Sequence, residues 1–162
     1  MNLNSLSTLF FAGLIFTLAP LSSFSQSAQT EMEIIQDAFG LDKKMAVATF
    51  MKLGDEAADF WDIYDAYENE RKEIGKKRIE VIVQYANSYP AISNEEILDL
   101  YEKTEDIKKA NAELLDSYFK KMKEEVGLQQ AAQFWHLENY FSAVIQVNIY
   151  AQLPFIGYEG RE

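Results

Sequence analysis

Apolar residues recur every three or four positions along most of the chain after residue 30, with strong helix formers between them. This spacing is typical of amphipathic α-helices, and no alternating apolar–polar run is longer than a few residues. The pattern predicts four helices, at about 31–52 with a break at Gly40, 55–88, 93–126 and 128–153. We therefore predict an all-α protein.

Helix-breaking and helix-capping residues indicate where these helices begin and end. Pro90 disfavours helix at the residue before it, and Pro154 stops the last helix. Ser93 and Glu96 form an S-x-x-E capping box at the start of the third helix, and Gly127 is placed as its C-terminal cap. The two middle helices are each about 50 Å long at 1.5 Å per residue. Their short connection predicts a long antiparallel hairpin between a shorter first helix and an apolar last helix.

Both long helices carry a seam whose spacings alternate between three and four, which keeps one stripe facing a partner helix. The seam of the second helix is Ala57, Phe60, Tyr64, Tyr67, Arg71, Ile74, Arg78, Val81 and Tyr85. The seam of the third helix is Ile97, Tyr101, Thr104, Lys108, Asn111, Leu115, Tyr118 and Met122. Both are polar in the middle, and a long basic side chain can lie along an apolar surface with its head in water. We expect the middle of the hairpin to be thin and open to solvent on one side.

The last helix is the most apolar segment and is apolar around most of its circumference near its end. This pattern predicts burial on more than one side, as at a subunit interface.

Carboxylates at Asp55, Asp59 and Asp62 share one helix face, which raises the question of a metal site. A di-metal centre in a bundle needs Glu-x-x-His pairs, but the single histidine, His136, follows Gln133. Calcium-loop spacing, a nucleophile elbow, an S-x-x-K pair and a Gly-rich phosphate loop are also missing from the sequence. We interpret the acids as a solvated face near a helix N-terminus, and we expect no enzyme activity, metal or other cofactor.

The first thirty residues contain no charged side chain and no histidine. The apolar run 9–19 followed by small residues has the layout of a secretory signal peptide, and it is shorter than the about 20 residues that span a bilayer. We expect cleavage after Ser25, with the later "SQSA" as the second choice and a retained anchor as the alternative. One all-helical domain, 26–162, then remains, periplasmic or else secreted, without stable membrane insertion.

Charge and cysteine content narrow the choice of partners. The chain has 15 basic and 26 acidic residues, a net charge of −11 and no cysteine. Nucleic acid is a poor partner for such an acidic chain, because affinity for phosphate depends on Lys and Arg, and we expect no nucleic-acid partner. Disulfides and thiol chemistry are impossible, so stability must come from packing.

Aromatic residues interleaved with basic ones suggest a binding surface. Tyrosine is favoured where one end of a side chain is dry and the other wet. We hypothesise that the seam tyrosines and basic residues form an amphiphilic surface, against the alternative of ordinary packing between helices. The candidate partner-binding residues are Trp61, Tyr64, Tyr67, Arg71, Arg78 and Lys108.

The stretch "LGDEAADFWDIYDAYENERKEI" resembles the helix opening of Spy/CpxP-type periplasmic proteins, whose LTxxQ motif starts a helix. Leu53 matches the motif leucine, while Gly54 and Ala57 replace its Thr and Gln. A second, weaker copy has Val126 at the Leu position and Gln130 at the Gln position.

The same stretch is similar to small exported proteins with "LTxEEAxxFWPxY", regarded as sensors paired with extracytoplasmic-function sigma factors. The residues that fit this form are Leu53, Glu56, Ala57, Phe60, Trp61 and Tyr64, with Asp62 in place of the proline.

These resemblances cover about residues 41–153 and imply a cradle of long curved hairpins, usually homodimeric. Spy-like members bind unfolded clients without ATP, and CpxP-like members regulate an envelope stress sensor. Spy-type cradles use positive charge, whereas this chain is acidic, with basic clusters only at 71–78 and 120–123. We therefore expect either an ATP-independent periplasmic chaperone or a sensory protein with one specific envelope partner.

Overall fold

The computed structural model describes residues 42–54 and 56–156. This part of the chain forms four helices, α2 (Lys43–Met51), α3 (Ala58–Ser88), α4 (Asn94–Glu125) and α5 (Leu128–Gln152). The described residues contain no strand, which confirms the all-α prediction. Residues 31–41 of the predicted first helix, with its break at Gly40, lie outside the described residues, as does Asp55.

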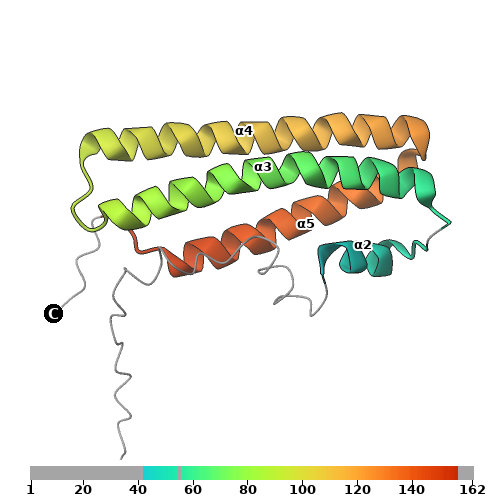
Figure 1. The fold of residues 1–162 in the computed structure, drawn as a ribbon, viewed down its shortest axis with the longest axis horizontal. Coiled ribbons are helices and arrows are strands. Elements are labelled where there is room, and N and C mark those ends of the chain that lie inside the picture. Colours follow the sequence, from blue (N-terminus) through green and yellow to red (C-terminus); the bar gives the residue numbers. More distant parts are fainter. Residues whose placement is uncertain (1–41, 55, 157–162) are drawn as a thin grey trace, which may run out of the picture.

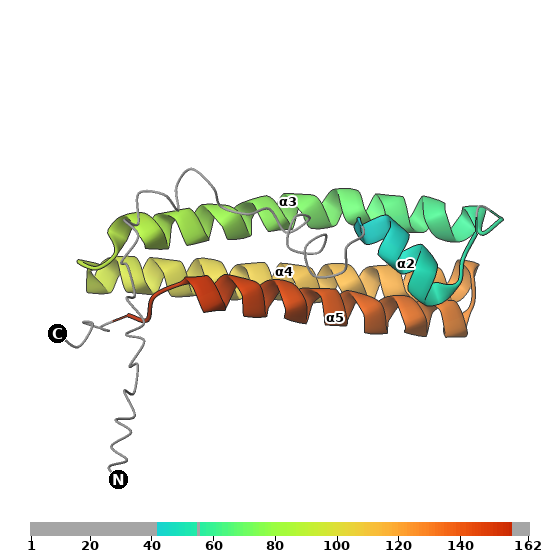
Figure 2. The ribbon, with the colours of Figure 1, turned by 90° about the horizontal axis from the view of Figure 1, so that it is seen from below.

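The helices α3, α4 and α5 are long rods that lie side by side (Figure 1). Neighbours along the chain run in opposite directions, and α4 packs against both α3 and α5. Seen from below, α3 and α5 flank α4, and the short α2 lies across the space between them at one end (Figure 2). The described bundle therefore has four helices in cross-section at one end and three at the other.

Helix ends follow the local signals closely. Ser93 Oγ accepts a hydrogen bond from the Glu96 amide at 3.2 Å, and the Glu96 carboxylate accepts one from the Ser93 amide at 2.8 Å. Gly127, with a φ of 104°, follows α4, and its amide donates to the Met122 carbonyl at 3.1 Å. The start of α3 is later than expected, because the Gly54 carbonyl accepts from the Ala57 amide in a turn that precedes the helix.

The apolar core is concentrated at the α2 end. Rings from α3, α4 and α5 meet there edge to face, with the centroid of Tyr67 5.0 Å from that of Phe134 and 5.4 Å from that of Tyr118. The cluster has members from all four helices: Ala46, Val47, Met51, Phe60, Ile63, Tyr64, Tyr67, Tyr118, Met122, Ala131, Phe134, Leu137, Phe141 and Ile145. This packing fixes α2 against the long helices.

Four charged side chains are buried beside this core, and we call Lys43, Glu68, Arg71 and Glu138 the buried charge cluster. Lys43 is 1% exposed, and its Nζ lies 2.6 Å from Glu68 Oε1 and 2.6 Å from Glu138 Oε2. Arg71 Nε donates to Glu68 Oε1 at 2.8 Å. Two cations thus face two carboxylates, and the Lys43 ammonium joins α2 to both α3 and α5.

Aromatic side chains complete the surroundings of the buried charge cluster. The Tyr67 hydroxyl donates to Glu138 Oε2 at 2.9 Å, and the rings of Tyr64, Tyr67 and Phe141 lie 5.3–6.0 Å from Lys43 Nζ. Among the described residues, no buried side-chain nitrogen or oxygen lacks a hydrogen-bond partner. The cost of burying the ions is therefore offset by direct partners and by the electron-rich faces of the rings.

Burial shifts the protonation equilibria of this region. It would by itself raise the pKa of Glu68, but Lys43 and Arg71 outweigh it and hold that pKa below its ordinary value. Burial, reinforced by the Glu138 carboxylate, raises the pKa of Tyr64 and of Tyr67. The fold thus favours the carboxylate of Glu68 and the neutral phenols of the two tyrosines.

The expectation of a thin, solvent-open middle is wrong at Arg71. Its side chain is buried against Glu68. The seams of α3 and α4 could not predict this burial, because it depends on Lys43 and Glu138, which lie far from Arg71 in the sequence. These two residues fill the region that was expected to be open to solvent.

Replacing Lys43 should destabilise the protein strongly. Lys43→Met leaves the Glu68 and Glu138 carboxylates without their shared cation, and breaking a buried pair in this way costs about 3–5 kcal/mol. Chemical denaturation measures the free energy of unfolding. Lys44→Met is the matched control, since Lys44 pairs with Asp65 in a half-exposed position and should lose about 0–1 kcal/mol. Equal losses in the two variants would show that burial of the cluster contributes nothing.

Stability should fall at both ends of the pH scale. The lowered pKa of Glu68 contributes stability that is present above the ordinary value of 4.5 and is lost as the pH falls below it. The raised pKa values of Tyr64 and Tyr67 contribute stability that is present below the ordinary value of 10.0 and is lost as the pH rises above it. Denaturation midpoints across this range should therefore form a plateau.

Tyr67→Phe serves as the control for the alkaline side of this plateau. It removes one ionisable phenol, so its stability should decline less steeply above pH 10 than that of the parent protein. Identical alkaline slopes in the two proteins would contradict the assignment.

Candidate functional site

Three of the predicted binding residues lie in the interior. Tyr64, Tyr67 and Arg71 are all buried, the first two in the aromatic core and Arg71 in the buried charge cluster. The side of α3 that carries them faces α2 and α5 as well as α4, so a partner at the surface would not meet these side chains. Their contacts in this structure hold the helices together.

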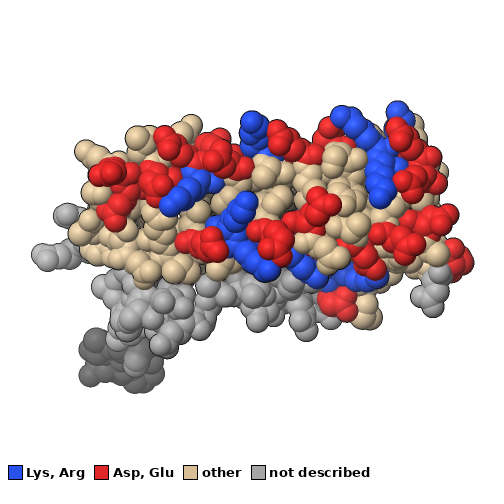
Figure 3. Space-filling view, turned by 45° about the horizontal axis from the view of Figure 1, so that its top comes forward, with Lys and Arg blue, Asp and Glu red and all other residues tan. Residues whose placement is uncertain are grey.

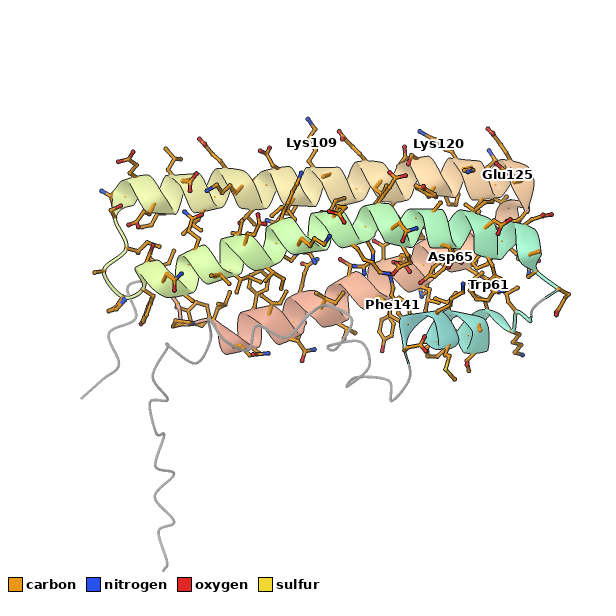
Figure 4. All side chains as sticks on the ribbon, viewed as in Figure 1. Trp61, Asp65, Lys109, Lys120, Glu125 and Phe141 are labelled. Atoms are coloured by element: carbon orange, nitrogen blue, oxygen red, sulfur yellow. The ribbon has the colours of Figure 1, made fainter. Side chains whose placement is uncertain are left out.

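Trp61 lies at the edge of the same core and is partly buried. Its Nε1 donates to the Gly54 carbonyl at 3.0 Å, and its ring centroid is 5.1 Å from that of Phe60. The Lys44 ammonium lies 5.2 Å from the centroid of the indole ring. Figure 4 shows Trp61 next to α2, where its contacts close the turn between α2 and α3.

The carboxylates at the start of α3 face solvent. Asp59 and Asp62 are exposed, and the exposed Asp65 pairs with Lys44 at 2.7 Å. Within residues 42–54 and 56–156, no group of three or more His, Cys, Asp or Glu side chains is placed to hold a metal ion. These positions are consistent with a solvated acidic face.

Arg78 of α3 and Lys108, near the middle of α4, line a cavity of about 720 Å³ that extends to the end of the bundle away from α2. We call it the open-end cavity. Helix α3 contributes Arg78, Val81, Ile82 and Tyr85, and α4 contributes Ile97, Leu100, Tyr101, Thr104, Glu105, Ile107 and Lys108. Gln146, Ile149 and Tyr150 of α5 and the segment 153–156 complete the lining.

The open-end cavity is apolar inside and has charges at few positions. Ile82, Leu100 and Ile107 are buried, and the charged lining residues are Arg78, Glu105 and Lys108. Lys108 Nζ donates to Glu105 Oε1 at 2.7 Å, and this hydrogen bond raises the pKa of Lys108. The cavity thus offers apolar contact inside and an ion pair at its edge.

One polar bond ties the end of the described chain to the cavity wall. The Tyr85 hydroxyl donates to the Pro154 carbonyl, and burial together with Tyr89 raises the pKa of Tyr85. The segment that follows α5 is thereby held against α3. Its Phe155 and Ile156 extend the apolar wall.

Exposed aromatic rings surround the cavity. Tyr101 of α4 is 61% exposed, Tyr150 of α5 is 57% exposed and Phe155 is 79% exposed. Of these three rings, only Tyr101 was predicted from the sequence to lie in a helix seam. Neither Tyr150 nor Phe155 was predicted as a binding residue. For Tyr150, the apolar character of the last helix was the sequence feature that could have indicated a binding surface.

The outer surface of α4 and α3 is highly charged. Lys109 and Lys120 project from α4 away from the other helices (Figure 4). Figure 3 shows basic and acidic side chains interspersed over the face that α4 and α3 present. The exposed rings that line the cavity differ in character from this charged face.

Comparison with known proteins adds no family assignment. No protein-family model, curated protein or solved structure matches this chain. Among the described helices, none has the length and apolar character needed to cross a membrane. The resemblance to Spy/CpxP-type proteins therefore remains a prediction.

Proposed function

We propose that this protein is an exported, non-enzymatic binding protein that receives apolar segments of other polypeptides in the open-end cavity. The observation that carries the proposal is the cavity itself, apolar inside, bordered by three helices and rimmed by exposed rings. Export is proposed from the uncharged, signal-peptide-like start of the sequence.

The size of the cavity suits a few apolar side chains of a bound chain. Its about 720 Å³ falls within the range of small-ligand pockets, and grooves between helices also accept the apolar face of an amphipathic helix. The exposed rings Tyr101 and Phe155 extend the contact beyond the cavity, which favours a polypeptide over a compact small molecule. The tyrosine hydroxyl also tolerates polar groups of a varied client.

This proposal puts the binding site at the open-end cavity, further from α2 than most of the binding residues predicted from the sequence. Arg78 and Lys108 remain in the proposed site as flanking cations. The other predicted residues, Trp61, Tyr64, Tyr67 and Arg71, lie at the end of the bundle that α2 covers, which we call the closed end. We propose that the closed end gives a rigid base and that the open end takes the client, as in an ATP-independent holdase.

A sensory protein with one specific envelope partner is the second candidate. The net charge of −11 favours it, because an acidic surface can steer and select a basic partner. A stoichiometric partner recovered by pull-down from an envelope extract would support this candidate. Recovery of only diverse unfolded chains would support the chaperone.

Substitutions at the rim of the open-end cavity should weaken client binding. The protein is purified from the envelope fraction of its host, so that any leader is processed as the cell does it. At stoichiometric amounts it should suppress light scattering by a chemically denatured client. Tyr101→Asp and Phe155→Asp should each reduce this suppression severalfold, because a charge at the rim opposes apolar contact.

Met45→Asp is the matched control, since Met45 is 54% exposed on α2 and does not line the cavity. It should suppress scattering as the parent protein does, and circular dichroism checks that every variant is folded. Unchanged scattering at severalfold excess of the parent protein would overturn the chaperone proposal. Equal loss in all three variants would overturn the location of the site.

A further inference from the structure

The open-end cavity has a polar end, where two cations come from facing helices. Gln84 of α3 donates to Asp99 of α4 at 2.7 Å and accepts from Lys103 at 2.9 Å, which aligns the two helices. Helices α3 and α4 run in opposite directions. The same alignment therefore puts Arg78 and Lys108 at one level, about 9 Å along the bundle from Gln84. Both residues line the cavity.

Helix α5 adds a polar, uncharged side chain at this level. It runs parallel to α3, and the hydrogen bond from Tyr85 to the Pro154 carbonyl aligns α3 with the end of α5. By the same count, Gln146 of the lining lies at the level of the two cations. Glu105 is the carboxylate among the lining residues. Two cations and one carboxylate give the lining a net charge of +1, in a chain whose net charge is −11.

Apolar side chains line the cavity beyond this polar end. They include Val81 and Ile82 of α3, Ile97 and Leu100 of α4, and Ile149 and Leu153 of α5. Lys108 and Ile97 are eleven positions apart, which is about 16 Å along the helix. One acyl chain spans half of a bilayer core of about 30 Å, so its length is about 15 Å. The apolar part of the cavity therefore has the length of a single acyl chain.

We infer that the open-end cavity binds one single-chain amphiphile with an anionic head, such as a long-chain carboxylate. The chain lies among the apolar side chains, and the head faces Arg78 and Lys108. The pair of Lys108 with Glu105 is half-exposed, so the head stays in contact with water. Guanidinium and ammonium groups bind carboxylate and phosphate through charge-assisted hydrogen bonds. A few polar groups at one end of an apolar pocket fix the orientation of such a ligand.

This inference goes beyond the proposed function and does not depend on it. An acyl chain is long and narrow, so it differs from the compact small molecule that the exposed rings disfavour. An amphiphile and a polypeptide client would occupy the same space and compete. Amphiphile binding is measured without any polypeptide, so its failure would leave client binding untouched.

Isothermal titration calorimetry measures binding of dodecanoate, below its micellar concentration, to the delipidated full chain from the envelope fraction. We expect one dodecanoate per chain. Decanoate should bind roughly tenfold more weakly, because it lacks two buried methylene groups. Dodecyl phosphate should bind as well, and the tighter of the two anions identifies a fatty acid or a lipid phosphate as the source.

The head group is tested on the parent protein with a cationic analogue, dodecyltrimethylammonium. Because an acidic surface attracts cationic molecules, this analogue is scored by its ability to displace dodecanoate. It should require at least a tenfold higher concentration than dodecyl phosphate. Absence of one-to-one dodecanoate binding, or equal displacement by the anionic and cationic amphiphiles, would overturn the inference. This comparison needs no variant.

The double variant Arg78→Gln/Lys108→Gln should weaken dodecanoate binding about tenfold or more, because it removes the charge-assisted hydrogen bonds to the head. The ratio between dodecanoate and decanoate should stay the same, since the contacts of the chain are unchanged. Lys103→Gln is the matched control, because Lys103 pairs with Asp99 on α4 and does not line the cavity. Circular dichroism checks that the variants are folded. An equal loss in Lys103→Gln would contradict the position of the head.

Discussion

The arrangement of the helices depends on the Lys43 ammonium, which Glu68 of α3 and Glu138 of α5 share at 2.6 Å each. Helices α3 and α5 both pack on α4, and α2 lies across the space between them. Burying an ion costs several kcal/mol unless its partners are in place. A shift of α2 along the bundle would separate Lys43 from both carboxylates, so the cluster permits one position of α2 against the long helices.

This position of α2 makes the two ends of the bundle different. At the closed end, rings such as Tyr67 and Phe134 pack around the buried charge cluster. At the other end, the described part of the chain has no short helix across α3 and α5, and the open-end cavity lies there. The stabilising contacts and the cavity that we propose as the binding site are thus separated along the long helices. Under the proposed function, substitutions at the exposed rim would act on binding with small effects on the fold, whereas those near Lys43 would act on the fold first.

Local signals in the sequence predicted the helices well and the contacts between them poorly. Ser93 and Glu96 bond across three positions, and Gly127 ends its helix through its own backbone, so both are readable from neighbouring residues. The seam of α3 showed that one face meets other helices. It could not show that the Tyr67 hydroxyl would donate to Glu138, 71 positions away. The exposed rim residue Phe155 was missed because its exposure depends on tertiary packing.

The buried charge cluster also affects the outer surface of α5. Because Glu138 turns inward to Lys43, α5 has no carboxylate to present to solvent, although the chain is strongly acidic. The same helix lines the open-end cavity with Ile149 and exposes Val147, which does not line that cavity. An acidic exterior repels acidic proteins, so an apolar helix face without carboxylates is an exception on this surface. Under the proposed function, the side of α5 that lines the cavity contacts the client, while Glu138 on the same helix binds Lys43 of α2.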